Sequence, residues 1–466
     1  MAIASQSIDR MVDEMPLTVR YWASFGLLGL LTVLDYFDLY IVAFLLAVLG
    51  PQWHLTFGQS AVILVSAGIG SIVGAVVWGG FADRYGRRAL VVAGTLVCGA
   101  SAALIALVPD GSWLLFALLR FLVGIGLAGA ATAAMTLAVE YTPNRWRILL
   151  TGLLVITANF GILLASATAA ILLAALGWRG VATIGIAPAV AGILFLGIAP
   201  ESARWLTAKG RREEARAAHA RMLGVSADEI ALPAASIATE RGVQPWSALL
   251  QDQRRLWLTL LLWAGTLTAT NGLYLWGPTL VSLSLGISSA EAGRIFSYVA
   301  TAGIVGKLIF SVLPIKTGRR WANTLGCLGA AALLLAIAAF HQERVAGIPM
   351  LVILLIACAL FLDGVISNIA PYTVEIYPTG LAARGYGLGQ AANGVGKIAG
   401  PLVLAIIAGT DNFVAPKATL EAMSPALVFL AGCVLASALA SIAIPIDPIR
   451  EQADDARLPE RKTVAS

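Results

Sequence analysis

The sequence predicts an all-α integral membrane protein, with twelve transmembrane helices in two pseudo-symmetric bundles of six. Of its 466 residues, 59% are hydrophobic and only 12% are charged, about half the charged share of a soluble domain. Apolar stretches long enough to cross a bilayer recur along the chain, and two loop motifs recur at almost one spacing. This composition excludes a disordered chain and holds more apolar sequence than one soluble core absorbs.

Turn residues and charges divide the apolar sequence into twelve stretches. Each is long enough to form a helix that crosses ~30 Å of hydrocarbon at ~1.5 Å per residue. The predicted helices lie near 22–48, 60–81, 89–108, 113–138, 148–176, 180–199, 256–283, 292–313, 321–340, 348–372, 384–408 and 425–446. Only Gly177, Trp178 and Arg179 separate the fifth from the sixth.

One long polar segment, 200–255, divides the chain. It begins with a stretch rich in Arg, Glu and Ala, which predicts a short amphipathic surface helix, and continues as a Pro-containing linker. We therefore expect an N-terminal six-helix bundle over 1–199, a cytoplasmic central loop over 200–255, a C-terminal bundle over 256–446 and a cytoplasmic tail over 447–466.

Basic residues predict the orientation. With the N-terminus inside, 24 of the 31 Lys and Arg residues fall in inner connections and only 4 in outer ones. This bias places both termini in the cytoplasm and explains the net charge of +5 without a nucleic-acid partner. We expect no cleavable signal peptide, because the first 20 residues are polar and no cleavage site follows the first apolar stretch. The excess of Arg over Lys favours a bacterial inner membrane.

Two motifs indicate an internal repeat. Glu140–Pro143 follows the fourth predicted helix and Glu375–Pro378 follows the tenth, 235 residues later. Gly86–Arg88 follows the second helix and Gly318–Arg320 follows the eighth, 232 residues later. Two independent matches at nearly one offset predict a duplicated six-helix unit, and parallel repeats of this kind are typical of transporters.

These loops resemble those of the major facilitator superfamily. GGFADRYGRR at 79–88 resembles its second–third loop signature, and RFLVGIG at 120–126 its fourth-helix motif. PESARWL at 200–206 and EIYPTGLAARGYG at 375–387 resemble boxes of its sugar porters and organic ion transporters. Ala203 replaces the usual Pro, and Ile315 stands where Asp is usual, so we do not expect a fully symmetric gate.

The resemblance implies a set of gating residues at the cytoplasmic ends of the helices. They are Gly79, Asp83, Arg84, Gly86, Arg87, Arg88, Glu140, Arg147, Glu201, Arg204, Gly318, Arg319, Arg320, Glu375 and Arg384.

Six ionisable residues lie well inside predicted spans, where a charge costs about 2.5–3.5 kcal/mol and therefore pairs or faces a cavity. They are Asp35, Asp38, Arg120, Lys307, Asp363 and Lys397. Asp35 and Asp38 share a helix face, and their depth coincides with that of Arg120. Protonation of an aspartate would release the arginine, and deprotonation would recapture it, which predicts a proton-coupled switch.

The first-helix sequence DYFD, Asp35 to Asp38, resembles the Asp-Gly-Phe-Asp motif of aromatic acid:proton symporters, with Tyr36 in place of Gly. The combination of Asp38 with Arg120 also resembles the proton-coupling pair of sugar:proton symporters. Both resemblances imply proton coupling, although uncoupled uniport remains an alternative.

The second half carries two buried cations, Lys307 and Lys397, which favour an anionic substrate. GVGK at 394–397 resembles the eleventh-helix Gly-x-Gly-Arg/Lys of aromatic-acid and organic-anion carriers, in which the cation faces the cavity. The structural alternative for Lys307 is a salt bridge with Asp363. Further candidates for shaping the pocket, each of which alternatively packs or anchors a helix, are Tyr36, Tyr40, Asn159, Asn271, Tyr274, Trp276, Asn368 and Tyr372.

The predicted function is secondary-active, proton-coupled uptake of a small organic anion, an aromatic or related carboxylate. The alternatives are a sugar:proton symporter, a drug/proton antiporter and a membrane receptor. The sequence shows no catalytic cluster, so we expect no enzyme, cofactor or metal. The expected partners are substrate, protons and lipid, with the protein a monomer. A literal GxGxxG at 124–129 lies inside the fourth span, where glycines favour close helix packing over dinucleotide binding.

Overall fold

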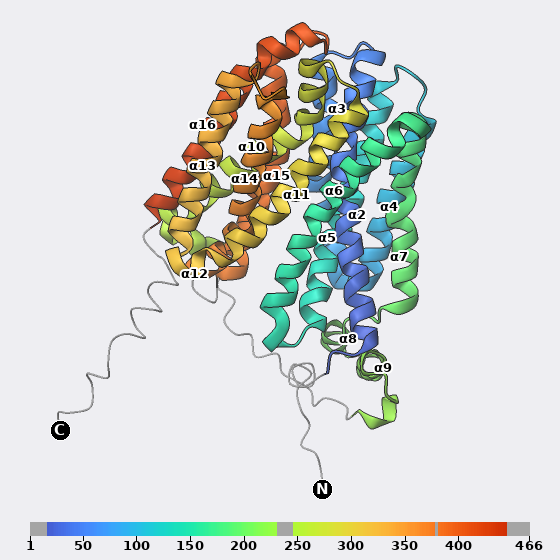
Figure 1. The fold of residues 1–466 in the computed structure, drawn as a ribbon. Coiled ribbons are helices and arrows are strands. Elements are labelled where there is room, and N and C mark those ends of the chain that lie inside the picture. Colours follow the sequence, from blue (N-terminus) through green and yellow to red (C-terminus); the bar gives the residue numbers. More distant parts are fainter. Residues whose placement is uncertain (1–15, 231–245, 378–380, 445–466) are drawn as a thin grey trace, which may run out of the picture. The chain divides into compact units, whose positions relative to one another are not determined.

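The computed structural model describes residues 16–230, 246–377 and 381–444, and these are mostly helical (Figure 1). The surroundings of some side chains within these ranges, Gly79 and Asp83 among them, lie outside the description. The chain divides into two units, Met1–Thr239 with Ser288–Arg294, and Glu240–Ile287 with Ile295–Ser466. Each unit is described by itself below.

Among its described residues, the first unit contains six longer helices, three further helical elements after them and the beginning of α11 (Ser289–Val312). Its long helices are α2 (Val19–Gln52), α3 (Phe57–Tyr85), α4 (Arg87–Leu104), α5 (Trp113–Tyr141), α6 (Asn144–Thr183) and α7 (Ala187–Ile198). Single 3₁₀ turns, η1 (Ile105–Leu107) and η2 (Ile184–Ile186), extend α4 and join α6 to α7. The remaining elements are α8 (Ala203–Ala208), α9 (Arg212–Leu223) and η3 (Ala227–Glu229).

The second unit repeats the pattern of long helices. Its elements are η4 (Trp246–Asp252), α10 (Gln253–Leu285), most of α11 (Ser289–Val312), α12 (Pro314–Thr317), α13 (Arg319–Phe340), α14 (Met350–Ile376), α15 (Ala382–Ala408) and α16 (Pro416–Ala443). Two short antiparallel strands, β1 (Arg344–Val345) and β2 (Ile348–Pro349), form the hairpin between α13 and α14.

The predicted fold class is confirmed. Among the described residues, ten helical stretches are long and apolar enough to span a membrane. One of them, Arg145–Ile198, holds the predicted fifth and sixth spans, and its backbone breaks at Gly177 (φ 64°, ψ 178°), where the sequence places their junction. The predicted seventh span is α10, which is 33 residues long but is not among the ten. Its interior carries threonines and an asparagine, which lower its hydropathy.

The predicted start of the last helix was wrong. The sequence placed it near residue 425, but α16 begins at Pro416. Proline is well tolerated in the first turn of a helix, because the backbone N–H it lacks would have no intrahelical partner there. The second proline, Pro425, lies inside α16.

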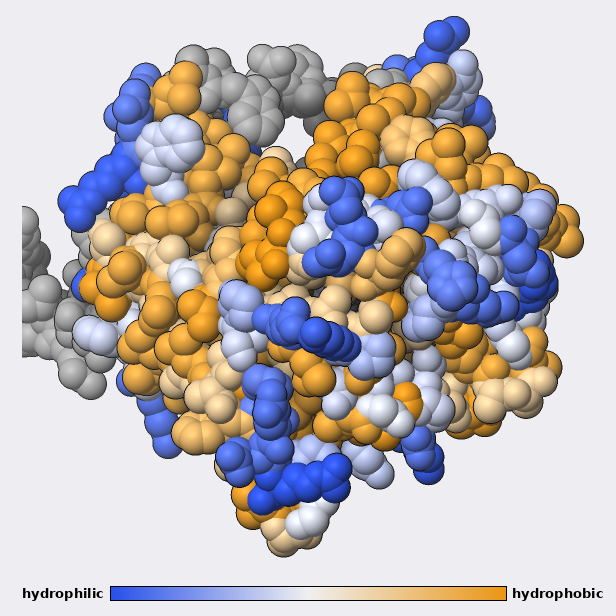
Figure 2. Space-filling model, turned by 90° about the horizontal axis from the view of Figure 1, so that it is seen from above, coloured by the Kyte–Doolittle hydropathy of each residue, from blue (hydrophilic) through white to orange (hydrophobic). Residues whose placement is uncertain are grey.

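Large apolar side chains face outward, as lipid requires. Ile171 is 70% exposed, Val76 is 78% exposed and Leu439 is 66% exposed. At the helix ends seen in Figure 2, hydrophilic groups (blue) gather between hydrophobic ones (orange). Apolar flanks with polar ends are the pattern of helices that cross a bilayer.

Glycines allow α5 to pack closely on its neighbours. A Cβ at Gly124 would meet the backbone of Ala67 in α3, and one at Gly126 would meet the backbones of Gly94 and Cys98 in α4. The interpretation of the glycine motif at 124–129 as a packing surface is therefore confirmed.

The predicted surface helix is α9, and Figure 1 shows it with α8 beside the beginning of α2. Thr18 Oγ1 donates a 2.6 Å hydrogen bond to the carbonyl of Met222, and Arg20 Nη1 donates a 3.2 Å bond to that of Arg221. These bonds satisfy carbonyls in the last turn of α9, which have no intrahelical partner. The predicted linker residues 231–245 lie outside the described part of the chain.

Candidate functional site

Asp38 and Arg120 form a buried ion pair inside the first unit. Asp38 lies in the middle of α2, and Arg120 lies in the second turn of α5. Arg120 Nη1 is 2.8 Å from Asp38 Oδ2 and 3.0 Å from the backbone carbonyl oxygen of the same residue. The side chains are only 3% and 2% exposed. The structure thus brings together the two residues whose depths the sequence matched.

A small cavity adjoins this pair. Its volume is about 10 Å³ and its lining includes Asp38, Arg120 and Phe116, and a space of this size is close to the least that holds one water molecule. Two guanidinium nitrogens of Arg120, Nε and Nη2, have no hydrogen-bond partner among the described residues. A water molecule in the cavity would supply one, since buried donors are normally satisfied.

The other first-helix candidates lie within about one turn of Asp38 along α2. Asp35 lies about one turn earlier in α2 and is partly buried. The rings of Tyr36 and Tyr40 are 6.2 Å apart, and Tyr40 is 5% exposed. In α6, Asn159 is 1% exposed. Asp35 shares the Asp38 face of α2, whereas Tyr36 and Tyr40, two residues before and two after Asp38, lie about 160° away from it around the helix.

In the second unit the charged candidates lie on three helices. Lys397 is partly buried in α15, and Lys307 in α11 is 3% exposed. Asp363 in α14 is 1% exposed, and its Oδ2 accepts a 2.5 Å hydrogen bond from the hydroxyl of Tyr274 in α10. The tyrosine thus connects α10 to the buried carboxyl group of α14.

Other predicted pocket residues are engaged inside the second unit. Asn271 donates from Nδ2 to the carbonyl of Leu267 in its own helix, at 2.8 Å. Trp276 donates from Nε1 to the carbonyl of Pro401 in α15, at 3.0 Å. Tyr372 is fully buried in α14. The Trp276 bond therefore holds α10 against α15.

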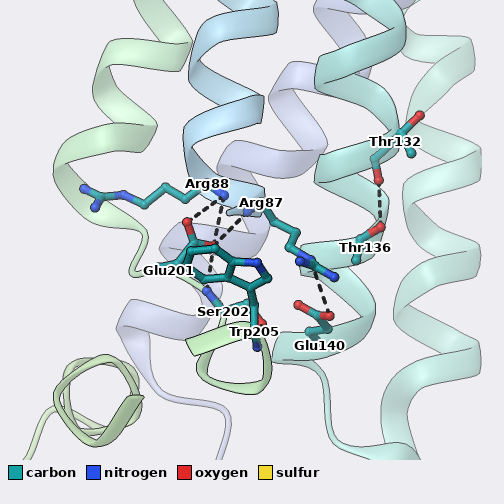
Figure 3. A network of polar contacts seen from close by, with 8 residues as sticks. All are labelled: Arg87, Arg88, Thr132, Thr136, Glu140, Glu201, Ser202 and Trp205. Atoms are coloured by element: carbon teal, nitrogen blue, oxygen red, sulfur yellow. Dashed lines mark hydrogen bonds and ion pairs between the residues drawn. The ribbon is translucent and has the colours of Figure 1, made fainter. Parts of the chain in front are cut away.

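Glu201 organises the gating motifs of the first unit (Figure 3). Its Oε1 accepts hydrogen bonds from the backbone N–H groups of Arg87 at 3.0 Å, Arg88 at 3.1 Å and Ser202 at 2.9 Å. The carboxylate therefore lies at the N-terminus of α4, where a helix dipole favours negative charge. Gly86, which precedes α4, has φ 97°, and a Cβ there would overlap the Glu201 carboxylate.

Further gating residues surround this cap. Figure 3 shows Arg87 beside Glu140, with Arg87 Nε 3.9 Å from Glu140 Oε1. The Arg88 guanidinium donates to the carbonyl of Leu196. Arg147 Nη2 donates to the carbonyl of Thr142 at 3.3 Å. A cavity of about 400 Å³ lies beside the network, lined by Arg87, Glu140, Arg204, Trp205, Ala208 and Lys209. Arg84 lies over the ring of Tyr85 at 5.3 Å; the surroundings of Gly79 and Asp83 lie outside the description.

The second unit repeats this local geometry. Gly318 precedes α13 with φ 83° and ψ 160°, close to the 97° and 161° of Gly86 before α4. Arg319 forms a bidentate pair with Glu375, at 2.6 Å and 2.8 Å. Its Nη1 also donates to Asn368 Oδ1 at 2.9 Å, and Asn368 Nδ2 donates to the Arg319 carbonyl at 3.0 Å. Asn368, predicted as a pocket residue, thus supports this motif.

Arg320 and Arg384 are the last two gating candidates. Arg320 lies over the ring of Trp321 at 5.7 Å, and Arg384 is partly buried near the beginning of α15.

Sequence reasoning missed a row of polar side chains on α15. Gln390 Nε2 donates to the hydroxyl oxygen of Tyr386 at 2.7 Å, and Asn393 Nδ2 donates to Gln390 Oε1 at 3.3 Å. Their spacing of four and three residues was visible in the sequence and places them on one helix face, the face that also carries Lys397.

Comparison with known proteins gives consistent matches over most of the chain. The model of the Major Facilitator Superfamily matches residues 28–401 and 278–466. The niacin transporter NiaP of Acinetobacter baylyi is 28% identical over 398 residues, which are 84% of this chain and 88% of that protein. The 4-hydroxybenzoate transporter PcaK of the same species is 26% identical over 430 residues, 88% and 89% of the two chains.

A solved structure shares the fold. The inward-open xylose transporter XylE of E. coli has a TM-score of 0.71 at 17% identity and covers 93% of this chain and 99% of its own.

Proposed function

The chain belongs to the Major Facilitator Superfamily, and we propose that it carries a small organic acid, an aromatic or related carboxylate, across the membrane together with protons. It is a multi-pass membrane transport protein and not an enzyme. The substrate class is supported by the niacin and 4-hydroxybenzoate transporters, whose similarity extends over most of both chains. The similarity to the xylose transporter, at 17% identity, concerns the fold and not the substrate.

The buried Asp38–Arg120 pair is the observation that carries proton coupling. An ionised carboxylate and a guanidinium at 2.8 Å stabilise each other in a site closed to bulk water. Protonation of Asp38 removes the negative charge and leaves Arg120 with an uncompensated positive charge. The two states therefore favour different arrangements of α2 and α5, which is what a proton-driven cycle requires.

A cation in the second unit supports an anionic substrate. Lys397 lies about 20 Å along α15 from Arg384, near the middle of a span. An ionisable residue at this depth faces protein or water, since lipid contact is costly. A carboxylate held there would form a charge-assisted hydrogen bond with the ammonium group.

The same proposal includes the orientation. The excess of basic residues in the predicted inner connections favours cytoplasmic termini, and the central segment 200–255 then lies in the cytoplasm. The bacterial relatives favour an inner-membrane location.

Transport by purified protein in proteoliposomes tests this function. We expect labelled 4-hydroxybenzoate or nicotinate to accumulate when the outside is acidic, and to equilibrate without accumulation when a protonophore dissipates the gradient. Labelled xylose is the control substrate. Accumulation of xylose instead of either acid would support the sugar symporter. Acid uptake that is the same with and without the proton gradient would support a uniporter.

A further inference from the structure

The helix α15 packs on α10 through one row of small residues. A Cβ at Gly389 would overlap the indole of Trp263, one at Gly396 would meet Leu267 and Thr268, and one at Gly400 would meet the backbones of Thr268 and Gly272. This row defines the face of α15 that is buried inside the second unit.

A second face of α15 is apolar and exposed. Val395, Leu402 and Ile406 are 54%, 40% and 57% exposed. Large aliphatic side chains that stay exposed on a membrane span are suited to lipid contact.

The third face carries Tyr386, Gln390, Asn393 and Lys397. At about 100° per residue, Asn393 and Lys397 each lie roughly 160° from Val395, and Tyr386 lies opposite it. Gln390 is nevertheless exposed, and Asn393 is only partly buried. Amide side chains are costly against lipid, so this face is turned to water or to a bound solute.

Hydrogen bonds order this polar face. Asn393 donates to Gln390 at 3.3 Å, Gln390 donates to Tyr386 at 2.7 Å, and the Tyr386 ring meets the Trp263 indole edge-on at 5.8 Å. The tyrosine is thereby held against α10, and the two amides are held in turn by the tyrosine. Asn393 keeps its carbonyl oxygen and a second N–H for another partner, since a primary amide has two donors.

We propose that Asn393 and Lys397 form a two-point recognition surface for ring carboxylates, with Gln390 and Tyr386 as positioning residues. The proposal rests on the proposed function. Lys397 binds the carboxylate, and Asn393, one turn away at about 6 Å along the axis, binds a second polar group on the far side of the ring. The transporter therefore prefers carboxylates that carry a hydroxyl or similar hydrogen-bonding group across the ring from the carboxylate.

Equilibrium binding in nanodiscs, without a proton gradient, tests the surface with two probes, benzoate and 4-hydroxybenzoate. Wild type should bind 4-hydroxybenzoate more tightly. Asn393→Ala should weaken 4-hydroxybenzoate binding about tenfold, the upper range for one hydrogen bond, and leave benzoate binding within about twofold. The matched control, Val395→Ala on the lipid face of the same helix, should leave both affinities unchanged.

A second variant keeps the proposal testable if Asn393→Ala does not fold. Tyr386→Phe keeps the ring contact with Trp263 and removes only the hydroxyl that holds Gln390. It should reduce the preference for 4-hydroxybenzoate by a smaller factor, again without changing benzoate binding. A role in packing alone would lower thermal stability without changing the ratio of the two affinities.

The outcomes separate this inference from the proposed function. If wild type binds both acids equally, or if Asn393→Ala weakens both by the same factor, the two-point surface is wrong while carboxylate transport stands. If wild type binds neither acid, the proposed function fails and this inference fails with it.

Discussion

Arg120 donates from one nitrogen, Nη1, to both the carboxylate and the backbone carbonyl of Asp38, at 2.8 Å and 3.0 Å. The carbonyl cannot be protonated, so that bond survives when the carboxylate gains a proton. Protonation therefore weakens the attachment of α5 to α2 without abolishing it. In the proposed proton coupling, this weakening would shift the equilibrium between two arrangements of α2 and α5, which requires only a few kcal/mol.

Replacing the carboxylate of Asp38 by an amide should uncouple transport from protons. In Asp38→Asn the side chain is permanently neutral, so uphill accumulation should disappear while exchange of labelled for unlabelled substrate continues. Asp35→Asn should also impair transport, with a less specific effect. Two proteoliposome assays are compared: accumulation driven by a proton gradient, and counterflow, which reports exchange of labelled for unlabelled substrate. Uphill uptake by Asp38→Asn together with continued proton influx would refute the assignment.

Removing the ammonium of Lys397 should weaken carboxylate binding. A charge-assisted hydrogen bond in a water-poor site contributes more than the ~1 kcal/mol of a neutral bond, so we expect Lys397→Ala to weaken binding more than about fivefold. Lys397→Arg should retain part of the affinity. Lys417→Ala, an exposed lysine at the beginning of α16, is the control for net charge. Normal carboxylate binding by Lys397→Ala would contradict the anion site.

The fold could be predicted from the sequence because a helix that crosses a bilayer must be apolar and must have a minimum length. The sequence also predicted that Asp38 and Arg120 lie at one depth, since helical rise converts residue number into height. The polar row of α15 was overlooked although its spacing is visible in the sequence, because Gln and Asn carry no charge that marks them as unusual in a span. The sequence could not show that Asn368 supports Arg319, because spacing along a chain does not reveal which buried amides pair across helices.

The two repeats should differ in the strength of their gating pairs. Arg319 contacts Glu375 through two bonds of 2.6 Å and 2.8 Å, whereas Arg87 is 3.9 Å from Glu140. Bidentate pairs are stronger than single distant ones, so a double-mutant cycle should give about 1 kcal/mol of coupling for the first and about 0.5 kcal/mol or less for the second. Thermal unfolding of the single and double alanine variants measures both. Equal coupling energies would contradict the asymmetry.

Alanine at Gly86 should destabilise the first unit. The residue has φ 97°, and a Cβ would overlap the carboxylate that caps α4. Backbone strain in this positive-φ region, which only glycine adopts readily, costs about 1–3 kcal/mol, and displacement of Glu201 adds to it. The control is Gly152→Ala in α6, where a Cβ would meet nothing within 4 Å, and alanine favours a helix. A melting temperature for Gly86→Ala equal to that of Gly152→Ala would contradict the capping geometry.

Acid should loosen α9 from the first unit through His219. This side chain is 7% exposed, and burial lowers its pKa below the ordinary value of 6.5, because the charged imidazolium is poorly solvated there. At low pH the undocked helix α9 therefore binds more protons than the docked helix does. The stabilisation is complete above about pH 6.5 and is lost as the pH falls through the lowered pKa. Hydrogen exchange of residues 212–223, corrected for the intrinsic pH dependence of exchange, should speed up over this interval. His219→Leu should remove this pH dependence. The control, His54→Gln, replaces an exposed histidine and should keep it. If protection in wild type is constant down to pH 5, His219 does not control docking.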